Sequence, residues 1–412
     1  MTKKKVYIFN TNSRAAIYGI GTYIAQLIDC LKEEEIEFGL IYIHAAGEEV
    51  TVTEEEGYQL ISIPNTNSCN SRGREYYTRN IVYLLKEFIP VEKGVEYIFH
   101  LNFMNNPALV SNLRKMFKCK VILVAHYSNW SFTLLGDNLK LQQILKKKPK
   151  KRNYSEQNIV KDIKEDAKMI TKCDKLVCIA RHSMESFIST CQIDTKKILL
   201  INNALKDCYI PVDEEQRRML KHKYYIQEGV PLLIFAGRLD EVKGITFLIQ
   251  AFRKVLETYK NARLLIAGDG SFNRWLKEAK DIWSQITFTG RLEKDILYEL
   301  YHIADMGIVS SLHEEFGFVA IEMMMNKLPI IVSDTGGLSE IVENGISGLK
   351  IPVMNDGKQQ VIDVEALSTK MMQLIEQPDY AKILAENARK RFLKKYDLTI
   401  FREKMLSLYR EV

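Results

Sequence analysis

Short apolar runs alternate with amphipathic stretches along most of the chain. The runs are rich in Val, Ile, Leu and Phe, and they predict strands buried on both faces, as in parallel sheets. The stretches between them repeat apolar residues at three- and four-residue spacing, which predicts helices packed on a sheet. The predicted strands are 5–10, 39–44, 97–101, 120–126, 175–180, 198–203, 231–237, 263–268, 286–289, 304–310 and 328–333. This alternation predicts an α/β protein with doubly wound sheets.

The alternation occurs twice, and the length of the chain suits two cores. A chain of 412 residues is too long for one ordinary core. We expect a first domain over residues 1–205 and a second over 206–390, with a charged, irregular segment over 207–229. The last helical stretch, residues 391–412, is predicted to cross back to the first domain.

The stretch 310–348 concentrates the candidate chemistry. A helix is predicted to begin near its Phe-Gly-Phe-Val sequence, and its unpaired N–H groups and positive dipole end favour an anion such as a diphosphate. The amides in question belong to Gly317, Phe318 and Val319. Glu322 lies about one turn further in, where a carboxylate can accept hydrogen bonds from both hydroxyls of a ribose. Glu314, on the loop before the helix, is placed to bind a sugar attached to such a diphosphate.

Glu314 and Glu322 form the pattern E-x7-E, followed by a Gly-Gly-Leu-Ser-Glu turn over 336–340. Two surface glutamates are the commoner explanation of such a pair, but the buried strand and glycine turn beside it favour a site. With these residues the sequence resembles the retaining glycosyltransferases of family 4, which have the GT-B fold. The resemblance implies two Rossmann-like domains facing a cleft. A nucleoside diphosphate sugar would bind the second domain and an acceptor the first.

Two cations follow the first strand of the second domain. Arg238 and Lys243 stand in the sequence GRLDEVKG, and a guanidinium fork and an ammonium suit a diphosphate leaving group. The resemblance gives them this role. It also places His126 beside the donor sugar, although a histidine at a strand end is more often structural. The catalytic residues that we expect are Arg238, Lys243, Glu314 and His126.

Gly19 and Gly21 follow the first strand of the chain. They would let the backbone approach the donor diphosphate or the acceptor, and a helix start without a ligand is the alternative. The arrangement also resembles a dinucleotide fingerprint. However, Ile24 occupies the third glycine position and the strand 39–44 ends without an acidic ribose partner, so a nicotinamide dehydrogenase is disfavoured.

Charge is divided unevenly along a chain of net charge +6, because residues 1–205 hold 29 Lys and Arg against 22 Asp and Glu. Such an excess fits an anionic membrane, a phosphorylated lipid or an acidic acceptor, although scattered solvated lysines are its commoner cause. Arg72, Arg74 and Arg79 are candidates for an anionic acceptor, with a solvated helix start as the alternative. The basic run 145–152 either contacts a membrane or forms a solvated, mobile insert.

Several classes of protein are disfavoured. No apolar run approaches the roughly 18 residues of a membrane-spanning helix, and the seven cysteines show no CxxC spacing. We therefore expect a cytoplasmic protein, with the inner membrane face as a candidate peripheral contact and no nucleic-acid partner. No Asp-x-Asp triplet occurs, so no metal site is expected.

The function that the resemblance implies is metal-independent transfer of a hexose-type sugar, with retention of anomeric configuration. The donor would be a nucleoside diphosphate sugar, with UDP favoured, acting as co-substrate without a further cofactor. The acceptor would be a glycan, a lipid or a peptide. Two alternatives remain open: a GT-B nucleotide-sugar epimerase, and a sugar-nucleotide-binding protein without transfer activity.

Overall fold

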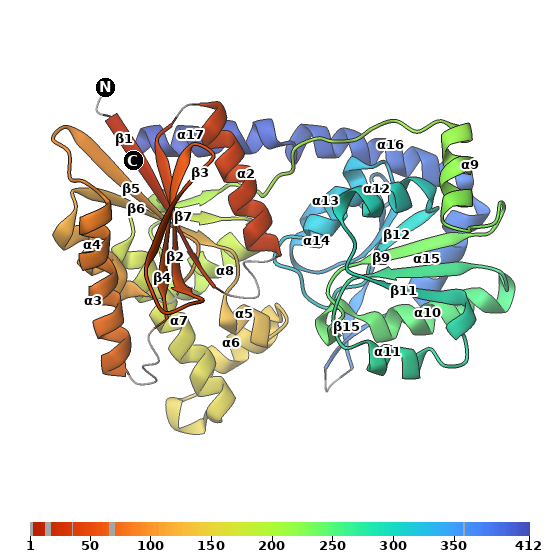
Figure 1. Cartoon of the computed structure of the whole chain (residues 1–412). Helices are drawn as coiled ribbons and strands as arrows, with labels where there is room; N and C mark the ends of the chain where they lie inside the picture. Colours follow the sequence, from red (N-terminus) through yellow and green to blue (C-terminus); the bar gives the residue numbers. More distant parts are fainter. Residues whose placement is uncertain (1–2, 13–17, 35, 66–70, 105, 357–358) are drawn as a thin grey trace. The chain divides into compact units, whose positions relative to one another are not determined.

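The chain divides into two compact α/β units (Figure 1). The computed structural model describes residues 3–12, 18–34, 36–65, 71–104, 106–356 and 359–412. The first unit holds Met1–Asn203 and Leu398–Val412, and the second holds Ala204–Asp397. The final segment joins the first unit at Leu398 rather than at residue 391, because helix α16 (Pro378–Lys395) continues within the second unit.

The first unit is built on an eight-stranded sheet with the strand order β3-β4-β2-β1-β5-β6-β7-β8. The strands are β1 (Lys3–Thr11), β2 (Phe38–Ala45), β3 (Thr51–Glu55), β4 (Tyr58–Pro64), β5 (Val95–Leu101), β6 (Cys119–Ala125), β7 (Lys175–Cys178) and β8 (Ile198–Leu200). All neighbours are parallel except β3 and β4, which form an antiparallel hairpin at one edge. The hairpin was not predicted, because every residue of β3 is exposed and the strand has no apolar run.

Helices pack against this sheet. Three of them, α3 (Ser71–Phe88), α4 (Pro107–Met116) and α7 (Tyr154–Lys172), pack one against the next, and their apolar residues join the strands in one core (Figure 1). The other helices of the unit are α2 (Gly19–Glu33), α5 (Asn129–Thr133), α6 (Asn138–Lys146), α8 (Arg181–Cys191) and α17 (Leu398–Glu411).

The C-terminal helix α17 packs on α2, the first helix of the chain. Phe401 meets Tyr23 edge-on, with 5.4 Å between ring centroids. The Tyr409 hydroxyl lies 2.8 Å from Nδ1 of His100, and the Lys4 ammonium donates to the carbonyl of Val412 at 2.7 Å. Residues from both ends of the chain therefore belong to one core.

The basic run 145–152 has regular local structure. It contains the end of α6 and a 3-10 turn over Pro149–Lys151. The Arg152 guanidinium donates to the carbonyl oxygens of Ile144 and Leu145, at 3.1 and 3.0 Å. These bonds satisfy carbonyls that the end of α6 leaves without partners.

The second unit is built on a six-stranded parallel sheet with the order β11-β10-β9-β12-β13-β14. Its strands are β9 (Leu232–Ala236), β10 (Arg263–Ala267), β11 (Ile286–Gly290), β12 (Met306–Val309), β13 (Ile330–Ser333) and β14 (Leu349–Ile351), beside a small hairpin of β15 (Val353–Asn355) and β16 (Gln360–Ile362). The order is doubly wound, and its switch point lies between the neighbouring strands β9 and β12. Ligands of such sheets bind at the carboxyl ends of the strands at this point.

Eight helices are described in the second unit. They are α9 (Glu214–Lys223), α10 (Ile245–Thr258), α11 (Phe272–Glu278), α12 (Lys294–Ile303), α13 (Phe318–Met325), α14 (Gly336–Ile341), α15 (Val364–Glu376) and α16. The segment 207–229, whose pattern is consistent with a linker and an entry helix, contains α9, whose start is fixed by a capping box between Asp213 and Gln216. Within the described part of the chain, no helix has both the length and the apolar character needed to cross a membrane.

Candidate active site

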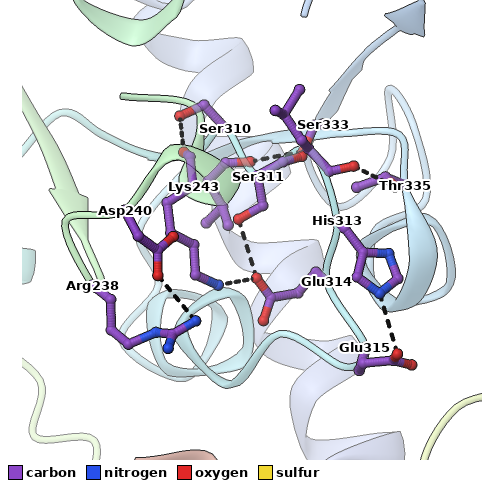
Figure 2. A network of polar contacts seen from close by, with 12 residues as sticks. Arg238, Asp240, Lys243, Ser310, Ser311, His313, Glu314, Glu315, Ser333 and Thr335 are labelled. Carbon is purple, nitrogen blue, oxygen red and sulfur yellow. Dashed lines mark hydrogen bonds and ion pairs between the residues drawn. The ribbon is translucent and has the colours of Figure 1, made fainter. Parts of the chain in front are cut away.

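The loops that follow β9 and β12 lie side by side at the switch point of the second sheet (Figure 2). The N–H of Leu312 donates to the carbonyl of Val242 at 2.7 Å, and the Ser310 hydroxyl donates to the carbonyl of Lys243 at 3.0 Å. Gly244 has a φ of +67°, and a Cβ at this position would lie 1.9 Å from the Ser310 carbonyl oxygen. Glycine is therefore required for the two loops to approach this closely.

The loop after β13 packs against the loop after β12. The Thr335 hydroxyl donates to the carbonyl of Leu312 at 3.1 Å, and the N–H of Gly337 donates to the carbonyl of Glu314 at 2.8 Å. A Cβ on Gly336 would lie 2.1 Å from the same Glu314 oxygen. The paired glycines of the sequence motif thus hold the backbone of Glu314 in place.

Lys243 and Glu314 form an ion pair between the first two loops (Figure 2). Their side chains are only 17% and 19% exposed, and the Ser311 hydroxyl donates to the same Glu314 oxygen at 3.1 Å. Burial alone would raise the pKa of Glu314. The charge of Lys243 and the hydrogen bonds from Lys243 and Ser311 outweigh burial, so this pKa lies below its usual value. Glu314 is therefore an ionised hydrogen-bond acceptor at neutral pH.

Arg238 also has a carboxylate partner, since its guanidinium lies 3.0 Å from Oδ2 of Asp240 (Figure 2). Oδ1 of Asp240 is buried and accepts no hydrogen bond from the described residues. The sequence suggested two cations available to a diphosphate, but each of them has a neighbouring carboxylate. Partly buried cations are stabilised by such partners. An anionic ligand would therefore have to share Arg238 and Lys243 with Asp240 and Glu314.

Helix α13 begins beside this cluster, and its predicted start at Gly317 is confirmed. Gly317 has a φ of +116°, and a Cβ there would lie 3.6 Å from Cγ of Glu314. Within the described residues, the amides of Phe318 and Val319 donate to no acceptor. Two unpaired N–H groups at the positive end of a helix dipole favour an anion.

Glu322, the predicted ribose acceptor, is buried in α13 and only 3% exposed. Its carboxylate forms an ion pair with the ammonium of Lys294, whose side chain is 55% exposed at the start of α12. The sequence did not indicate this pair, because the two residues stand on different helices and share no motif. A ribose at this position would compete with Lys294 for the carboxylate.

The predicted glycine loop of the first unit differs from expectation. Gly19 and Gly21 lie in the first turn of α2 and not in the turn before it, while residues 13–17 are outside the described residues. The N-cap Tyr18 makes no side-chain capping bond. The expectation that Gly19 and Gly21 approach a diphosphate stays a prediction.

His126 follows β6 and is held by Asn102, which follows β5. The amide of Asn102 donates to the carbonyl of Phe9 at 2.9 Å, so its Oδ1 faces Nε2 of His126 at 2.8 Å and accepts a hydrogen bond from it. The Tyr23 ring packs edge-on against the imidazole, at 4.7 Å between centroids. Burial lowers the pKa of His126 to about 3. His126 is therefore neutral with its proton on Nε2, and Nδ1 is left as a hydrogen-bond acceptor.

Replacing Asn102 with aspartate is expected to raise the pKa of His126, because a carboxylate at this distance stabilises the imidazolium. Imidazole ¹⁵N shifts of the histidine-labelled protein, followed from pH 5 to 8, measure both the tautomer and the pKa. The wild type should show a neutral ring with the proton on Nε2. Asn106→Asp, the same change at the N-cap of α4, is the matched control and should leave the His126 signals unchanged. A proton on Nδ1 in the wild type would contradict this assignment.

The part of the chain that holds these residues matches a known protein family. Residues 216–391 match the family model described as glycosyl transferases group 1. The matched range contains Arg238, Lys243, Glu314, Gly317 and Glu322. This part of the chain resembles the group 1 glycosyltransferases, and we call it the group 1 domain.

Curated relatives resemble the chain over the same part. An uncharacterized glycosyltransferase of Methanocaldococcus jannaschii is 25% identical over 241 residues, which cover 57% of this chain and 60% of the relative. The lipopolysaccharide 1,2-N-acetylglucosaminetransferase of Salmonella typhimurium is 31% identical over 193 residues, which cover 42% of this chain and 50% of the relative. The chain thus spans 50 to 60% of the length of these two relatives.

Solved structures resemble the whole chain. A sucrose-phosphate synthase of Thermosynechococcus elongatus matches with a TM-score of 0.76 and 18% identity, covering 99% of this chain and 98% of that one. The Anabaena protein HepE in complex with UDP and glucose matches with a TM-score of 0.72 and 14% identity over 100% of both chains. The likeness confirms the predicted GT-B fold, with a second Rossmann-like unit beside the group 1 domain. That the two units face a cleft stays a prediction.

Sequence analysis missed several polar residues of the group 1 domain. They are Asp240, Lys294, Ser310, Ser311, Ser333 and Thr335. Five of them follow or end predicted strands at the carboxyl edge, where the loops of a doubly wound sheet meet, and this position could have identified them. Lys294 had no such indication, because its contact with Glu322 depends on how α12 and α13 pack.

Proposed function

We propose that the protein transfers a hexose-type sugar from a nucleoside diphosphate sugar to a glycan, lipid or peptide acceptor, with retention of anomeric configuration. UDP is the favoured nucleotide, since HepE, a protein of the same fold, was solved with UDP and with UDP-glucose. The observation behind the proposal is the meeting of Arg238, Lys243 and the free amides of α13 at the switch point of a group 1 domain.

The chemistry required is the separation of charge at the anomeric carbon. When the bond from this carbon to the phosphate oxygen breaks, positive charge develops on the sugar and negative charge on the departing diphosphate. Arg238, Lys243 and the start of α13 would stabilise the diphosphate by preorganised electrostatics. The acceptor oxygen would bond to the anomeric carbon on the face that the diphosphate leaves. Its proton would pass to the diphosphate, giving a nucleoside diphosphate and a glycoside.

The other predicted residues fit this scheme as binding groups. Glu314, kept ionised by Lys243, would accept hydrogen bonds from sugar hydroxyls, and Glu322 would accept them from the ribose. His126 would accept, through Nδ1, a hydrogen bond from a hydroxyl of the donor sugar. Because side-chain cations meet the diphosphate charge in this scheme, we propose that transfer needs neither a metal nor a further cofactor.

The first test is a thermal-shift panel of UDP-, GDP- and ADP-glucose. A ligand at 100 times its dissociation constant adds about 2.7 kcal/mol to the stability of the folded protein, so one nucleotide should raise the melting temperature clearly. Glu322→Gln should weaken this shift for the nucleotide sugar, because the amide accepts fewer hydrogen bonds from a ribose. Glu365→Gln, on the exposed side of α15 in the same unit, is the matched control.

The second test separates transfer from the alternatives. Product analysis by NMR with and without an acceptor distinguishes a glycoside from a free epimerised nucleotide sugar, and the coupling constant at the anomeric carbon reports retention or inversion. Turnover in the presence of EDTA tests metal independence. Failure of all three nucleotide sugars to bind would contradict the proposed function.

A further inference from the structure

A polar cavity lies between the helices α3, α4 and α7 of the first unit. Its volume is about 550 Å³. Sites for small molecules commonly have volumes of roughly 300–1,000 Å³. We call it the α3–α4–α7 cavity, and it has room for a ligand of several heavy atoms. All of its lining residues lie in the first unit, so it is distinct from the loops of the group 1 domain.

Four cationic side chains and one carboxylate line the cavity. Arg79 and Glu75 come from α3, Lys115 comes from α4, and Lys168 and Lys172 come from α7. Four positive charges less one negative charge leave a net lining charge of +3. Lys168 and Lys172 lie one turn apart on the same helix, where like charges repel each other. A cavity with this lining attracts anions.

Within the described part of the chain, none of the four cations has a carboxylate partner. The Lys172 ammonium donates to the Ser111 hydroxyl, which connects α7 to α4 but leaves the charge uncompensated. Arg114 stands next to Lys115 in the chain and does have a partner, since its guanidinium lies 2.6 Å from Asp174. Carboxylates are thus available near this end of α4, and the cavity cations do not use them.

The neutral groups of the cavity suit a ligand that is more than a bare ion. Ser111 and Asn112 add polar atoms beside the cations, while Val82 and Met116 add apolar surface. Tyr83 lines the cavity with a ring that is 57% exposed. A ligand with an anionic group and a larger neutral part matches this mixture.

We propose that the α3–α4–α7 cavity binds a phosphate-bearing ligand, carried either by a small soluble molecule or by a lipid headgroup. The Arg79 guanidinium offers a planar pair of donors, and Lys115, Lys168 and Lys172 offer compact charges, so together they match several phosphate oxygens. The proposal concerns the first unit alone and does not depend on the transferase activity proposed for the chain.

Lysine labelling with inorganic pyrophosphate as the probe tests the site directly. An amine-reactive reagent is applied with and without pyrophosphate, and each lysine is quantified by mass spectrometry. Lys115 and Lys168 should be protected, whereas Lys118 and Lys164, exposed lysines near them in the chain that do not line the cavity, should not. Because the measurement is local, pyrophosphate bound by the group 1 domain does not affect it. Equal labelling of all four lysines would overturn the proposal.

Lys168→Ala should weaken pyrophosphate binding about tenfold, read as the concentration that half-protects Lys115, because it removes one charged hydrogen bond. Lys164→Ala, one turn earlier on α7, is the matched control and should leave this concentration unchanged. Equal losses in the two variants would show attraction by the general basic charge of the unit and would overturn a defined site.

Vesicles of phosphatidylcholine, with and without phosphatidic acid, distinguish the two sources of phosphate. A lipid headgroup is identified if Lys115 and Lys168 are protected by the vesicles that contain phosphatidic acid and not by those of phosphatidylcholine, and if pyrophosphate reverses this protection. Protection by pyrophosphate without vesicle binding identifies a soluble ligand. Absence of protection by both probes would overturn the proposal.

Discussion

Lys243→Met is expected to lower kcat about 100-fold, with a much smaller change in KM for the nucleotide sugar. The ammonium of Lys243 pairs with Glu314, which lies on the loop that leads into α13, and the departing diphosphate is proposed to gain negative charge there. An interaction that strengthens as this charge grows stabilises the transition state more than the bound substrate. A loss of about 2.7 kcal/mol of this stabilisation corresponds to 100-fold in rate. Steady-state kinetics with the identified donor and acceptor measure both constants.

The same substitution leaves the carboxylate of Glu314 without its cation, so its effect on folding has to be measured separately. Urea unfolding of Lys243→Met gives this structural cost, and Lys243→Arg, which keeps the positive charge, should recover much of the rate. Lys254→Met on α10 is the matched control, because Lys254 pairs with the exposed Glu365. If Lys243→Met and Lys254→Met had the same kcat, the role proposed for Lys243 would be wrong.

Acid should destabilise the first unit through two buried histidines. The pKa values of His100 and His126 are lowered from 6.5 to about 3, in both cases by burial and, for His100, also by repulsion between the two imidazoles when both are protonated. Below pH 6.5 the unfolded chain binds protons at these residues and the folded chain does not, so stability falls with pH. From pH 7 to pH 5 each histidine should lower the free energy of unfolding by about 2 kcal/mol, and the two together by about 4 kcal/mol.

Proton uptake by Asp166 offsets part of this loss of stability. Burial raises its pKa from 3.8 to about 7, although the Trp130 indole donates to its carboxylate at 2.9 Å. The folded state then binds a proton as pH falls from 7 to 5, while the unfolded state does not, which offsets about 2 kcal/mol of the loss. Asp166→Asn keeps an acceptor for Trp130 and removes the titration. Over this pH range the free energy of unfolding should therefore fall by about 4 kcal/mol in the variant and by about 2 kcal/mol in the wild type.

Urea titrations at pH 5, 6 and 7 test this difference, with the unfolded fraction of the first unit read from pulsed hydrogen exchange of a β5 peptide. Glu165→Gln, an exposed carboxylate next to Asp166 on α7, should keep the wild-type pH dependence. Equal pH dependence in Asp166→Asn and the wild type would show that Asp166 takes up no proton in the folded protein between pH 7 and pH 5, which would contradict its raised pKa. A flat profile in both proteins would contradict the neutral state of His100 and His126.

The elements that the sequence predicted are those whose pattern is local. Each predicted strand corresponds to a strand of the two sheets, because a strand buried on both faces needs an uninterrupted apolar run. The start of α13 was predicted from Gly317, a residue whose positive φ the helix start requires. The hairpin β3–β4 and the short strands β14 to β16 lack such runs, since they lie at sheet edges or outside the main sheets.

The site was predicted less completely than the fold. Arg238, Lys243, Glu314 and the start of α13 were all identified, since they follow predicted strands and belong to a spaced motif. Their partners Asp240 and Lys294 were not recognised, because pairing depends on tertiary packing that spacing along the chain does not encode. The same limit applies to Asn102, whose effect on His126 requires β5 and β6 to be neighbours.

The position of α17 has a consequence for biosynthesis. Its ring contact with Tyr23 and its hydrogen bond to His100 come from the last fifteen residues, Leu398–Val412, whereas the rest of its unit is translated before Ala204. While the ribosome makes the intervening unit, the surfaces of α2 and β5 that α17 will cover have no native partner. The earlier half of the protein therefore completes its folding last, and this interval is when the nascent chain is most exposed to misassembly or to chaperones.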